Sequence, residues 1–555
     1  MTVTLQPVVL DAAAVSRCRR RVHLDHDPSA VGSPRARPDP ALEQRRADAV
    51  EHRVVVGQVL ASQACGGEWV EVPSGAPTQE RLMATGAAVA AGARYIWGGL
   101  LPLDVPGART GSPDLLVRAA GGGYHPVIIV RHRITDAGSG ALCTQLDQLD
   151  PALAAPDPQR KVRSQTRDQL RLAHLVRMLQ AAGWAAGPPE FGAVIGMDAD
   201  VVLWHDLAAP TWPDGHSTLA EYDRRFADRL AVVRAAASGG PALAQPSRVN
   251  ECRHCSWWPT CEPQLSARLD VSLVLRGEPA VALRAVGVET VADLAALDPA
   301  GEPPVPLGVM PFADAVALAR AWQRELSVVR RVPRVAVPRA DVELDVDLES
   351  FGEAGAYLWG CHLTYADGMA LSEPPGYRAF ATWCPLPDAD EGRSFAEFWG
   401  WLRALRAQAA AAGRSFAAYC YNAQAENRWL YSSVERFAGQ HGVPSAAEIT
   451  EFVESGEWVD LFALVSEWFL CAHGKGLKRI APQAGFEWHD PEAGGENSMR
   501  WYRDAVGMND VPPEQAAAQR ARLLVYNSDD VAATLALRRW MCSPAVLQIP
   551  LAADL

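Results

Sequence analysis

The sequence predicts a multidomain α/β protein, and three observations support this fold class. First, 555 residues are too many for a single hydrophobic core. Second, helical and strand-like patterns occur together in residues 1–265 and again in residues 341–555. Third, residues 266–340 hold short helical segments and end in RRVPRVAVPRA, a proline- and arginine-rich stretch typical of a connector. We therefore expect three domains with these boundaries.

The composition is ordinary for a soluble globular protein, with 49% hydrophobic and 21% charged residues. The N-terminal stretch lacks the pattern of a signal peptide, and no apolar run is long enough to span a bilayer. We therefore expect a cytoplasmic protein that does not bind membranes. The net charge of −13 argues against a surface covered with nucleic-acid contacts, although it leaves room for a local basic groove.

The C-terminal region begins with three predicted strands. DVELDVDLES, residues 341–350, alternates strictly, so its apolar side chains should share one face and its acidic side chains the other. GAYLWGCHLTY, residues 355–365, is a second strand. ADG at 366–368 is a turn signal that predicts a hairpin into a third strand.

A helix, a buried strand and a second helix should follow. Ser394 and Glu397 have the spacing of a capping box, which predicts a helix over 394–413. SFAAYCYN, residues 415–422, is typical of a buried strand, and AQAENRWLYSSVERFAG, residues 423–439, predicts a helix. Three hairpin-connected strands followed by helix, strand and helix resemble the RNase H-like fold.

Acidic residues occur at three points of this region. Asp347-x-Glu349 ends the first strand, Glu426 follows the buried strand, and Tyr526-x3-Asp530 lies in a helical pattern near the C-terminus. In this order the motifs resemble those of the DEDD exonucleases, specifically the tyrosine-containing DEDDy type, which hydrolyse DNA or RNA from a 3′ end. A solvated acidic edge strand is the alternative interpretation of the first motif.

The resemblance implies a two-metal centre. Asp347, Glu349, Glu426 and Asp530 would hold two Mg²⁺ or Mn²⁺ ions about 3.5–4 Å apart, and Tyr526 would orient the attacking water. Glutamate stands at 426 where the family more often has aspartate. Asp529 could compete with Asp530, but the spacing from the tyrosine favours Asp530.

Four cysteines form a second pattern. Cys252-x2-Cys255-x5-Cys261 follows a single upstream Cys18 at long distance. Thiolates in a reducing compartment are typical metal ligands. The pattern resembles the iron–sulfur staple of RecB/AddB-type nucleases, which implies a [4Fe–4S] cluster. A zinc site and unliganded buried thiols are the alternatives. The remaining cysteines should be core residues: Cys65, Cys143, Cys361, Cys384, Cys420, Cys471 and Cys542.

The same resemblance implies a PD-(D/E)xK nuclease domain in residues 1–265, a restriction-endonuclease-like fold. His52 matches the family's helix histidine, Asp114 its strand aspartate, and Gln169 the glutamine of the following helix. The carboxylate-x-lysine motif fails, because YHPVIIVRHR offers only isoleucines and Arg131 there. Arginine stays protonated and positions water poorly. We therefore expect a degenerate domain that binds nucleic acid or organises the rest of the chain.

The middle segment and one downstream stretch add two further expectations. LRAVGVETVADLAAL, residues 283–297, resembles a helix–hairpin–helix unit, with a plain helical packing module as the alternative. GLKRIAPQAGFEWHD resembles part of a bacterial family of RecB-like nucleases with an appended RNase H-like domain, and Lys478 in it is a candidate phosphate contact.

Together these patterns predict a metal-dependent nuclease, most simply a 3′→5′ exonuclease acting on single-stranded DNA or RNA. The alternative is a non-catalytic iron–sulfur protein that binds nucleic acid or organises a complex.

Overall fold

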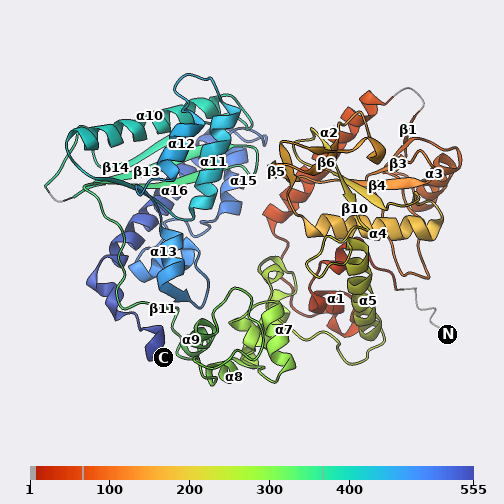
Figure 1. The fold of residues 1–555 in the computed structure, drawn as a ribbon, viewed down its shortest axis with the longest axis horizontal. Coiled ribbons are helices and arrows are strands. Elements are labelled where there is room, and N and C mark those ends of the chain that lie inside the picture. Colours follow the sequence, from red (N-terminus) through yellow and green to blue (C-terminus); the bar gives the residue numbers. More distant parts are fainter. Residues whose placement is uncertain (1–7, 65–67, 367) are drawn as a thin grey trace. The chain divides into compact units, whose positions relative to one another are not determined.

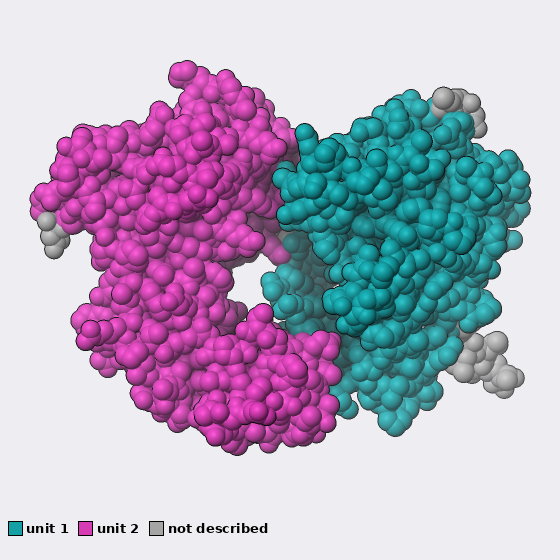
Figure 2. All heavy atoms as spheres, viewed as in Figure 1, with its two compact units in different colours: residues 1–267 teal, residues 268–555 magenta. Residues whose placement is uncertain are grey.

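The computed structural model describes residues 8–64, 68–366 and 368–555. It divides into two compact units, residues 1–267 (unit 1) and residues 268–555 (unit 2), which Figure 2 colours separately. Most of the expected connector, from residue 268 onward, therefore belongs to the second unit. Cys65 and Asp367 lie outside the described residues, so the core position expected for Cys65 and the turn expected around Asp367 stay predictions.

Unit 1 is built on an eight-stranded mixed sheet with the strand order β1-β2-β3-β4-β9-β10-β6-β7 (Figure 1). A separate two-stranded sheet pairs β5 with β8. The strands are β1 Trp69–Glu71, β2 Tyr95–Trp97, β3 Leu115–Arg118, β4 Tyr124–Ile129, β5 Thr135–Ala137, β6 Ala141–Thr144, β7 Ala155–Asp157, β8 Arg160–Val162, β9 Phe191–Ile195 and β10 Val202–Asp206. The helices are α1 Arg19–His26, α2 Pro40–Gln63, α3 Thr78–Ala90, α4 Thr166–Ala182, α5 Thr218–Ala237 and α6 Trp258–Ala267.

Helices cover both faces of this sheet because its central strands are apolar on both sides. Leu115 and Val117 of β3 pack with Val56 and Leu60 of α2. Leu116, between them, points the other way and joins the cluster formed by α4 and α5. Successive strand residues point to opposite faces, so a continuous apolar run is what a strand buried on both sides requires.

Unit 2 contains a five-stranded sheet with the order β14-β13-β12-β15-β16. β12 pairs antiparallel with β13 and β13 with β14, whereas β15 and β16 run parallel to β12. A short antiparallel pair, β11 with β17, stands apart. The strands are β11 Val328–Arg330, β12 Val342–Ser350, β13 Ala356–Tyr365, β14 Gly376–Ala381, β15 Phe416–Cys420, β16 Trp458–Asp460 and β17 Phe469–Cys471.

Ten helices complete the described part of unit 2 (Figure 1). They are α7 Glu278–Ala285, α8 Val291–Ala295, α9 Phe312–Gln323, α10 Asp390–Ala411, α11 Ala423–Arg436, α12 Ala446–Val453, α13 Leu461–Trp468, α14 Leu477–Ile480, α15 Gly495–Ala505 and α16 Pro513–Met541. Within the described residues, none of the helices of either unit combines the length and the apolar character needed to cross a membrane.

The alternation of β12 sorts its side chains as the sequence predicts. Val342, Leu344 and Val346 are fully buried against α10 and its neighbours. The acidic residues between them point to the opposite face, where α16 lies against β12 and β13. The hydrophobic face of the strand therefore fixes which residues α16 meets.

One local prediction is wrong, and one predicted hairpin has a longer loop than expected. α10 begins at Asp390, four residues before the expected cap, and the Ser394 hydroxyl donates to the carbonyl of Glu391 inside the helix. The capping-box pattern at Ser394 therefore has no capping role. The third strand, β14, begins at Gly376 rather than directly after residues 366–368, so a longer loop joins it to β13.

The segment from 268 to 340 forms short helices, and α7 and α8 flank a turn in which Gly287 has a φ of +86°. The helix–hairpin–helix assignment stays a prediction. Arg330 is 7% exposed, and its guanidinium donates to the carbonyls of Ile549, Pro333 and Leu547. This arginine serves the packing of the chain's C-terminal end.

Candidate metal centre

Acidic side chains meet at one edge of the unit 2 sheet. β12, β15 and β16 are parallel, so their carboxyl ends lie at the same edge. Asp347 and Glu349 lie near the end of β12, and Asp460 ends β16. Glu426 lies in the first turn of α11, which follows β15. Residues far apart in sequence are thereby brought to one place.

Three of the predicted ligands come together. Asp347, Glu349 and Asp530 each offer a carboxylate oxygen, and these oxygens all lie within 4.8 Å of one another. Asp530 reaches this position from α16, the helix that covers the acidic face of β12 and β13. Oxygen-only donor sets of this kind suit hard divalent cations such as Mg²⁺ and Mn²⁺.

Glu426, the fourth predicted ligand, lies nearby but outside this 4.8 Å group. It is 4% exposed, and its Oε2 is buried with no hydrogen-bond partner among the described residues. Burial, with a further contribution from the charge of Asp460, raises its pKa to about 8. A buried carboxylate oxygen without a donor is costly unless a proton or a cation satisfies it.

The carboxyls of the cluster all have raised pKa values. Burial and then the charges of Asp530, Glu349 and Glu426 raise the pKa of Asp347 well above its ordinary value. Burial and the charge of Asp530 raise the pKa of Glu349 to about 8. Burial also raises the pKa of Asp530, although Lys478 opposes the shift. Crowded carboxylates cannot all ionise unless positive charge compensates them, which makes the donor set suitable for divalent cations.

Tyr526 lies beside this cluster, one helical turn before Asp530, and is 3% exposed. Its hydroxyl accepts a hydrogen bond from Lys478 Nζ at 2.9 Å. The same Nζ is 3.7 Å from Asp530 Oδ1. Lys478, predicted as a phosphate contact, is therefore positioned as the cation next to the carboxylates and the tyrosine.

Several residues that hold the carboxylates escaped the sequence analysis. Asn527 Nδ2 donates to Asp347 Oδ2 at 2.9 Å, and Trp488 Nε1 donates to Asp530 Oδ1 at 2.6 Å. Ser498 Oγ donates to Glu349 Oε2 at 3.0 Å. Asn527 precedes Asp530 by three residues, so helical periodicity could have indicated it. Trp488 and Ser498 come from a loop and from α15, and no local pattern marks them.

A glycine on the neighbouring strand makes room for Asn527. Gly360 of β13 pairs with Asp347 of β12. A Cβ atom at residue 360 would lie only 1.6 Å from Asn527 Oδ1, which accepts a hydrogen bond from the Tyr377 hydroxyl at 2.7 Å. The amide that orients Asp347 therefore occupies the space of a missing side chain.

The other acidic residues nearby have different partners. Asp529 accepts hydrogen bonds from the backbone N–H of His489 at 2.9 Å and from its Nδ1 at 2.7 Å. Glu343 and Asp345 bind Arg538, whose side chain is completely buried. Of the two adjacent aspartates on α16, Asp530 is the one whose carboxylate lies with those of Asp347 and Glu349.

The predicted unit 1 residues do not assemble in this way. Asp114, just before β3, is 5% exposed and pairs with Arg53 at 3.1 Å and Arg171 at 3.3 Å. His52 Nε2 lies 3.1 Å from the carbonyl oxygen of Gly196, and burial lowers its pKa. The described residues show no hydrogen bond from Asp114 to His52 or to Gln169, which is half-buried in α4. Two arginines thus occupy the carboxylate that a metal would use.

The four predicted cluster cysteines line one pocket of unit 1, which brings Cys18 to Cys252, Cys255 and Cys261. Burial raises the pKa of Cys252 and Cys261 to about 11 and also raises that of Cys255. Among the described residues, these thiols do not form a group whose sulfur atoms all lie within 4.8 Å. Trp257 is completely buried beside them and donates from Nε1 to Asp25 at 2.7 Å.

Residues 414–542 match a family model described as RNase_H superfamily. Unit 2 contains an RNase H-like domain. The matched residues run from the start of β15 to the end of α16, so they include Glu426, Tyr526 and Asp530. This family match indicates a nuclease-type function and a nucleic-acid substrate in general, and RNase H-like nucleases use divalent metals. A comparison with curated proteins and one with solved structures found no match.

Proposed function

We propose that unit 2 is a divalent-metal-dependent nuclease that hydrolyses single-stranded nucleic acid from its 3′ end. The observation that carries this proposal is the meeting of Asp347, Glu349 and Asp530 within 4.8 Å at the carboxyl edge of the sheet. The RNase H superfamily match supports nuclease chemistry in general. The 3′→5′ direction is what the resemblance of these motifs to those of the DEDDy exonucleases implies, with Tyr526 one turn before Asp530.

The chain supplies the ligands and holds them in place. Asp347, Glu349, Glu426 and Asp530 would hold Mg²⁺ or Mn²⁺. When bound, such cations stabilise charge on the phosphate and lower the pKa of the attacking water. Asn527 and Trp488 each fix one oxygen of a ligating aspartate by donating a hydrogen bond, which lowers the cost of assembling the site.

Tyr526 would position the water that attacks the phosphate. Burial and the neighbouring carboxylates raise the pKa of its hydroxyl, so the phenol stays protonated. Its O–H group can therefore act as a hydrogen-bond donor to the oxygen of the water. Lys478 donates to the same hydroxyl and lies beside Asp530. This lysine would balance part of the negative charge of the phosphate.

The test compares Asp347→Asn with Asp341→Asn. Both variants remove a carboxylate from the acidic face of residues 341–350. Asp341, however, lies at the start of this stretch, away from the carboxylate cluster, and accepts hydrogen bonds from Ser415. The substrate is a 5′-labelled single strand incubated with Mn²⁺. The wild type and Asp341→Asn should give a ladder that shortens from the 3′ end, and Asp347→Asn should give none. Undegraded strand with the wild-type chain would contradict the proposal and leave the non-catalytic alternative.

For unit 1 we propose a degenerate RecB-like domain whose four cysteines hold a [4Fe–4S] cluster. Four cysteine thiols line one pocket, and as soft ligands that bind a metal once deprotonated they support a metal centre of this kind. Anaerobically purified protein should show a broad visible absorption with about four irons per chain, and Cys261→Ser should lose it. One zinc per chain and no visible absorption would instead identify a zinc site.

A further inference from the structure

Two adjoining hollows of unit 1 are lined by residues that suit an anionic, aromatic ligand. The first has a volume of about 310 Å³ and lies between α2, β1 and β2. The second has a volume of about 790 Å³ and lies between the N-terminal segment, α2 and α4. Ser112 lines both, so the two hollows share part of a wall close to Asp114. We call them the tryptophan pocket and the arginine groove.

The arginine groove is strongly basic in a chain whose net charge is −13. Among the described residues, six arginines line it with two acidic residues, Asp11 and Glu251. The arginines are Arg17, Arg21, Arg45, Arg46, Arg167 and Arg171. Arg17 and Arg21 pair with the two acidic residues, and Arg171 pairs with Asp114. Arg46 and Arg167 are exposed, so their guanidinium groups can reach an anion.

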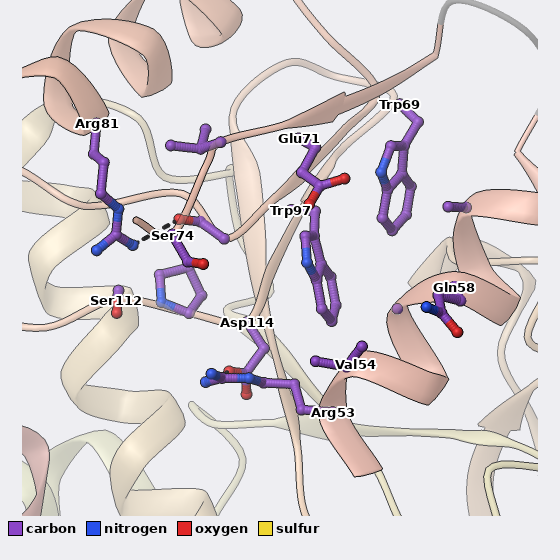
Figure 3. Close-up of a pocket in the computed structure, with 15 residues that line it drawn as sticks. Arg53, Val54, Gln58, Trp69, Glu71, Ser74, Arg81, Trp97, Ser112 and Asp114 are labelled. Carbon is purple, nitrogen blue, oxygen red and sulfur yellow. Dashed lines mark hydrogen bonds and ion pairs between the residues drawn. The ribbon is translucent and has the colours of Figure 1, made fainter. Parts of the chain in front are cut away.

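The tryptophan pocket offers aromatic faces. Trp69 and Trp97 are half-buried, and their rings stack with centroids 5.8 Å apart. Figure 3 shows the two indoles side by side, with Arg53 against Asp114 and Arg81 across the hollow. Trp97 can lie here because α2 has glycine at residue 57, where a Cβ atom would come within 2.5 Å of the indole. Tryptophan faces at an accessible pocket are typical platforms for stacking nucleobases.

Arginines from both hollows hold the carboxylate of Asp114, which itself lines the tryptophan pocket. Arg53, which lines the tryptophan pocket, donates to its Oδ1, and Arg171, which lines the groove, donates to its Oδ2. The backbone N–H of Ile129 also donates to Oδ2 at 2.8 Å. Arginine does not lose its proton in proteins, so both ion pairs persist at any physiological pH. A carboxylate held in this way neutralises arginines instead of collecting cations.

We propose that unit 1 binds single-stranded nucleic acid without cutting it, with the phosphates in the arginine groove and a base in the tryptophan pocket. Phosphates supply the charge that Arg46 and Arg167 can neutralise, and an unpaired base supplies the flat face that Trp97 can stack on. A duplex keeps its bases stacked inside the helix, so it cannot fill the pocket. This inference uses unit 1 residues alone and stands apart from the hydrolysis proposed for unit 2.

Binding is tested on the full chain by fluorescence anisotropy in EDTA, so that no metal-dependent hydrolysis interferes. The probes are labelled single-stranded DNA, single-stranded RNA and duplex DNA. At least one single strand should bind more tightly than the duplex, and the DNA and RNA arms identify which sugar the site accepts. Asp341→Asn, which changes a residue paired with Ser415 and away from the carboxylate cluster, should bind as tightly as the wild type. Equal affinity for single strand and duplex would overturn the proposal.

Arginine variants locate the phosphate contacts. Arg46→Ala/Arg167→Ala should weaken binding and lower the slope of log affinity against log salt by about 1.4, because each lost contact to a single strand contributes about 0.7. The control is Arg118→Ala/Arg234→Ala, which removes two exposed arginines of unit 1 that line neither hollow. Equal salt slopes for the two double variants would overturn the assignment of the groove.

Tryptophan variants locate the base. Trp97→Ala should weaken binding at least about fivefold, and Trp97→Phe should weaken it less because an aromatic face remains. Because Trp97→Ala could also loosen the pocket wall, an independent measurement uses the wild-type chain. A single strand carrying 5-iodouracil should crosslink on irradiation to Trp69 or Trp97. Crosslinks found only in unit 2 would overturn the proposal.

Discussion

Glu343 and Glu349 lie towards opposite ends of β12 and on the same face, yet their pKa values shift in opposite directions. Burial raises the pKa of Glu343, but hydrogen bonds from Arg339 and Arg538 outweigh it and lower the value to about 2. Burial and the charge of Asp530 raise the pKa of Glu349, six residues on, to about 8. The strand and the face are shared, so the partner supplied by the rest of the fold decides the difference.

The comparison separates a structural ion pair from the proposed cation site. At the first end Arg538 donates from Nε and Nη2 to Asp345, at 3.1 and 2.7 Å, and is itself completely buried. At the second end, the ion pairs found among the described residues give Asp347 and Glu349 no arginine. The acidic residues of a single strand can therefore form buried ion pairs at one end and the proposed cation site at the other.

Removing the buried arginine at the first end of β12 should have the largest effect on stability. Arg538→Met leaves Asp345 buried without its cation and leaves Glu343 with Arg339 alone, and we expect a loss of about 3–5 kcal/mol in the free energy of unfolding. Denaturant unfolding followed by circular dichroism measures it. Arg539→Met, one residue on and exposed, is the matched control and should change stability by less than about 0.5 kcal/mol. Equal stability of the two variants would contradict the structural role of Arg538.

Removing a carboxylate from the cluster at the second end of β12 should affect activity rather than folding. Asp530→Asn removes a predicted ligand, and we expect Mn²⁺-dependent degradation to fall by more than about 100-fold, since even residues that merely support ligands are worth about 10–100-fold. Initial rates on a labelled single strand measure this. Asp529→Asn changes the neighbouring residue, whose partner is His489, and should cost less than about threefold. Similar losses in both variants would place the metal elsewhere.

Neutralising one carboxyl at each end should change stability in opposite directions at pH 9 without metal. Asp345→Asn loses charge-assisted hydrogen bonds to Arg538 and should destabilise the chain by about 1–3 kcal/mol. Glu426→Gln removes a buried negative charge whose Oε2 has no partner among the described residues, and should stabilise it. Thermal unfolding in EDTA measures both. If both variants raised or both lowered the unfolding temperature, the proposed difference between the two ends of β12 would be contradicted.

The pH dependence of stability should follow from the raised pKa values at the second end of β12. Glu349 and Glu426 have pKa values near 8 in the folded chain and ordinary values of 4.5 when unfolded. Between these values the folded chain holds protons that the unfolded chain has released, so stability should fall as pH rises. In EDTA we expect the unfolding temperature to drop by about 10 °C from pH 6 to 9, and Mn²⁺ should reduce the drop. An unchanged profile with Mn²⁺ would show that the cation does not replace these protons.

The sequence predicts the regular parts of unit 2 because their causes are local. The alternation in 341–350 predicts a strand with apolar and acidic faces, and β12 has both. The buried strand and the helix after it are confirmed as β15 and α11. The capping box fails because Ser394 is buried inside α10, and Glu391 is held by Arg436 from the distant helix α11. A three-residue spacing carries no information about such a partner.

The site was only partly predictable for the same reason. Acidic residues in motif order indicate Asp347, Glu349, Glu426 and Asp530, and three of these carboxylates meet. The donors that hold them come from several elements and share no pattern. Asp114 shows the converse case, because the sequence shows that a motif lysine is missing but not that Arg53 and Arg171 pair with the remaining carboxylate.

The absence of a side chain at residue 360 has a consequence for how much this domain can change. Asn527 fits between α16 and the sheet only because β13 offers bare backbone opposite Asp347. One added methyl group there would push the amide aside and release an aspartate on a different strand. A position that contributes no charge is thus as restrictive as the acids themselves, and we expect homologues that keep the acids but carry a side chain at residue 360 to lack the proposed nuclease activity.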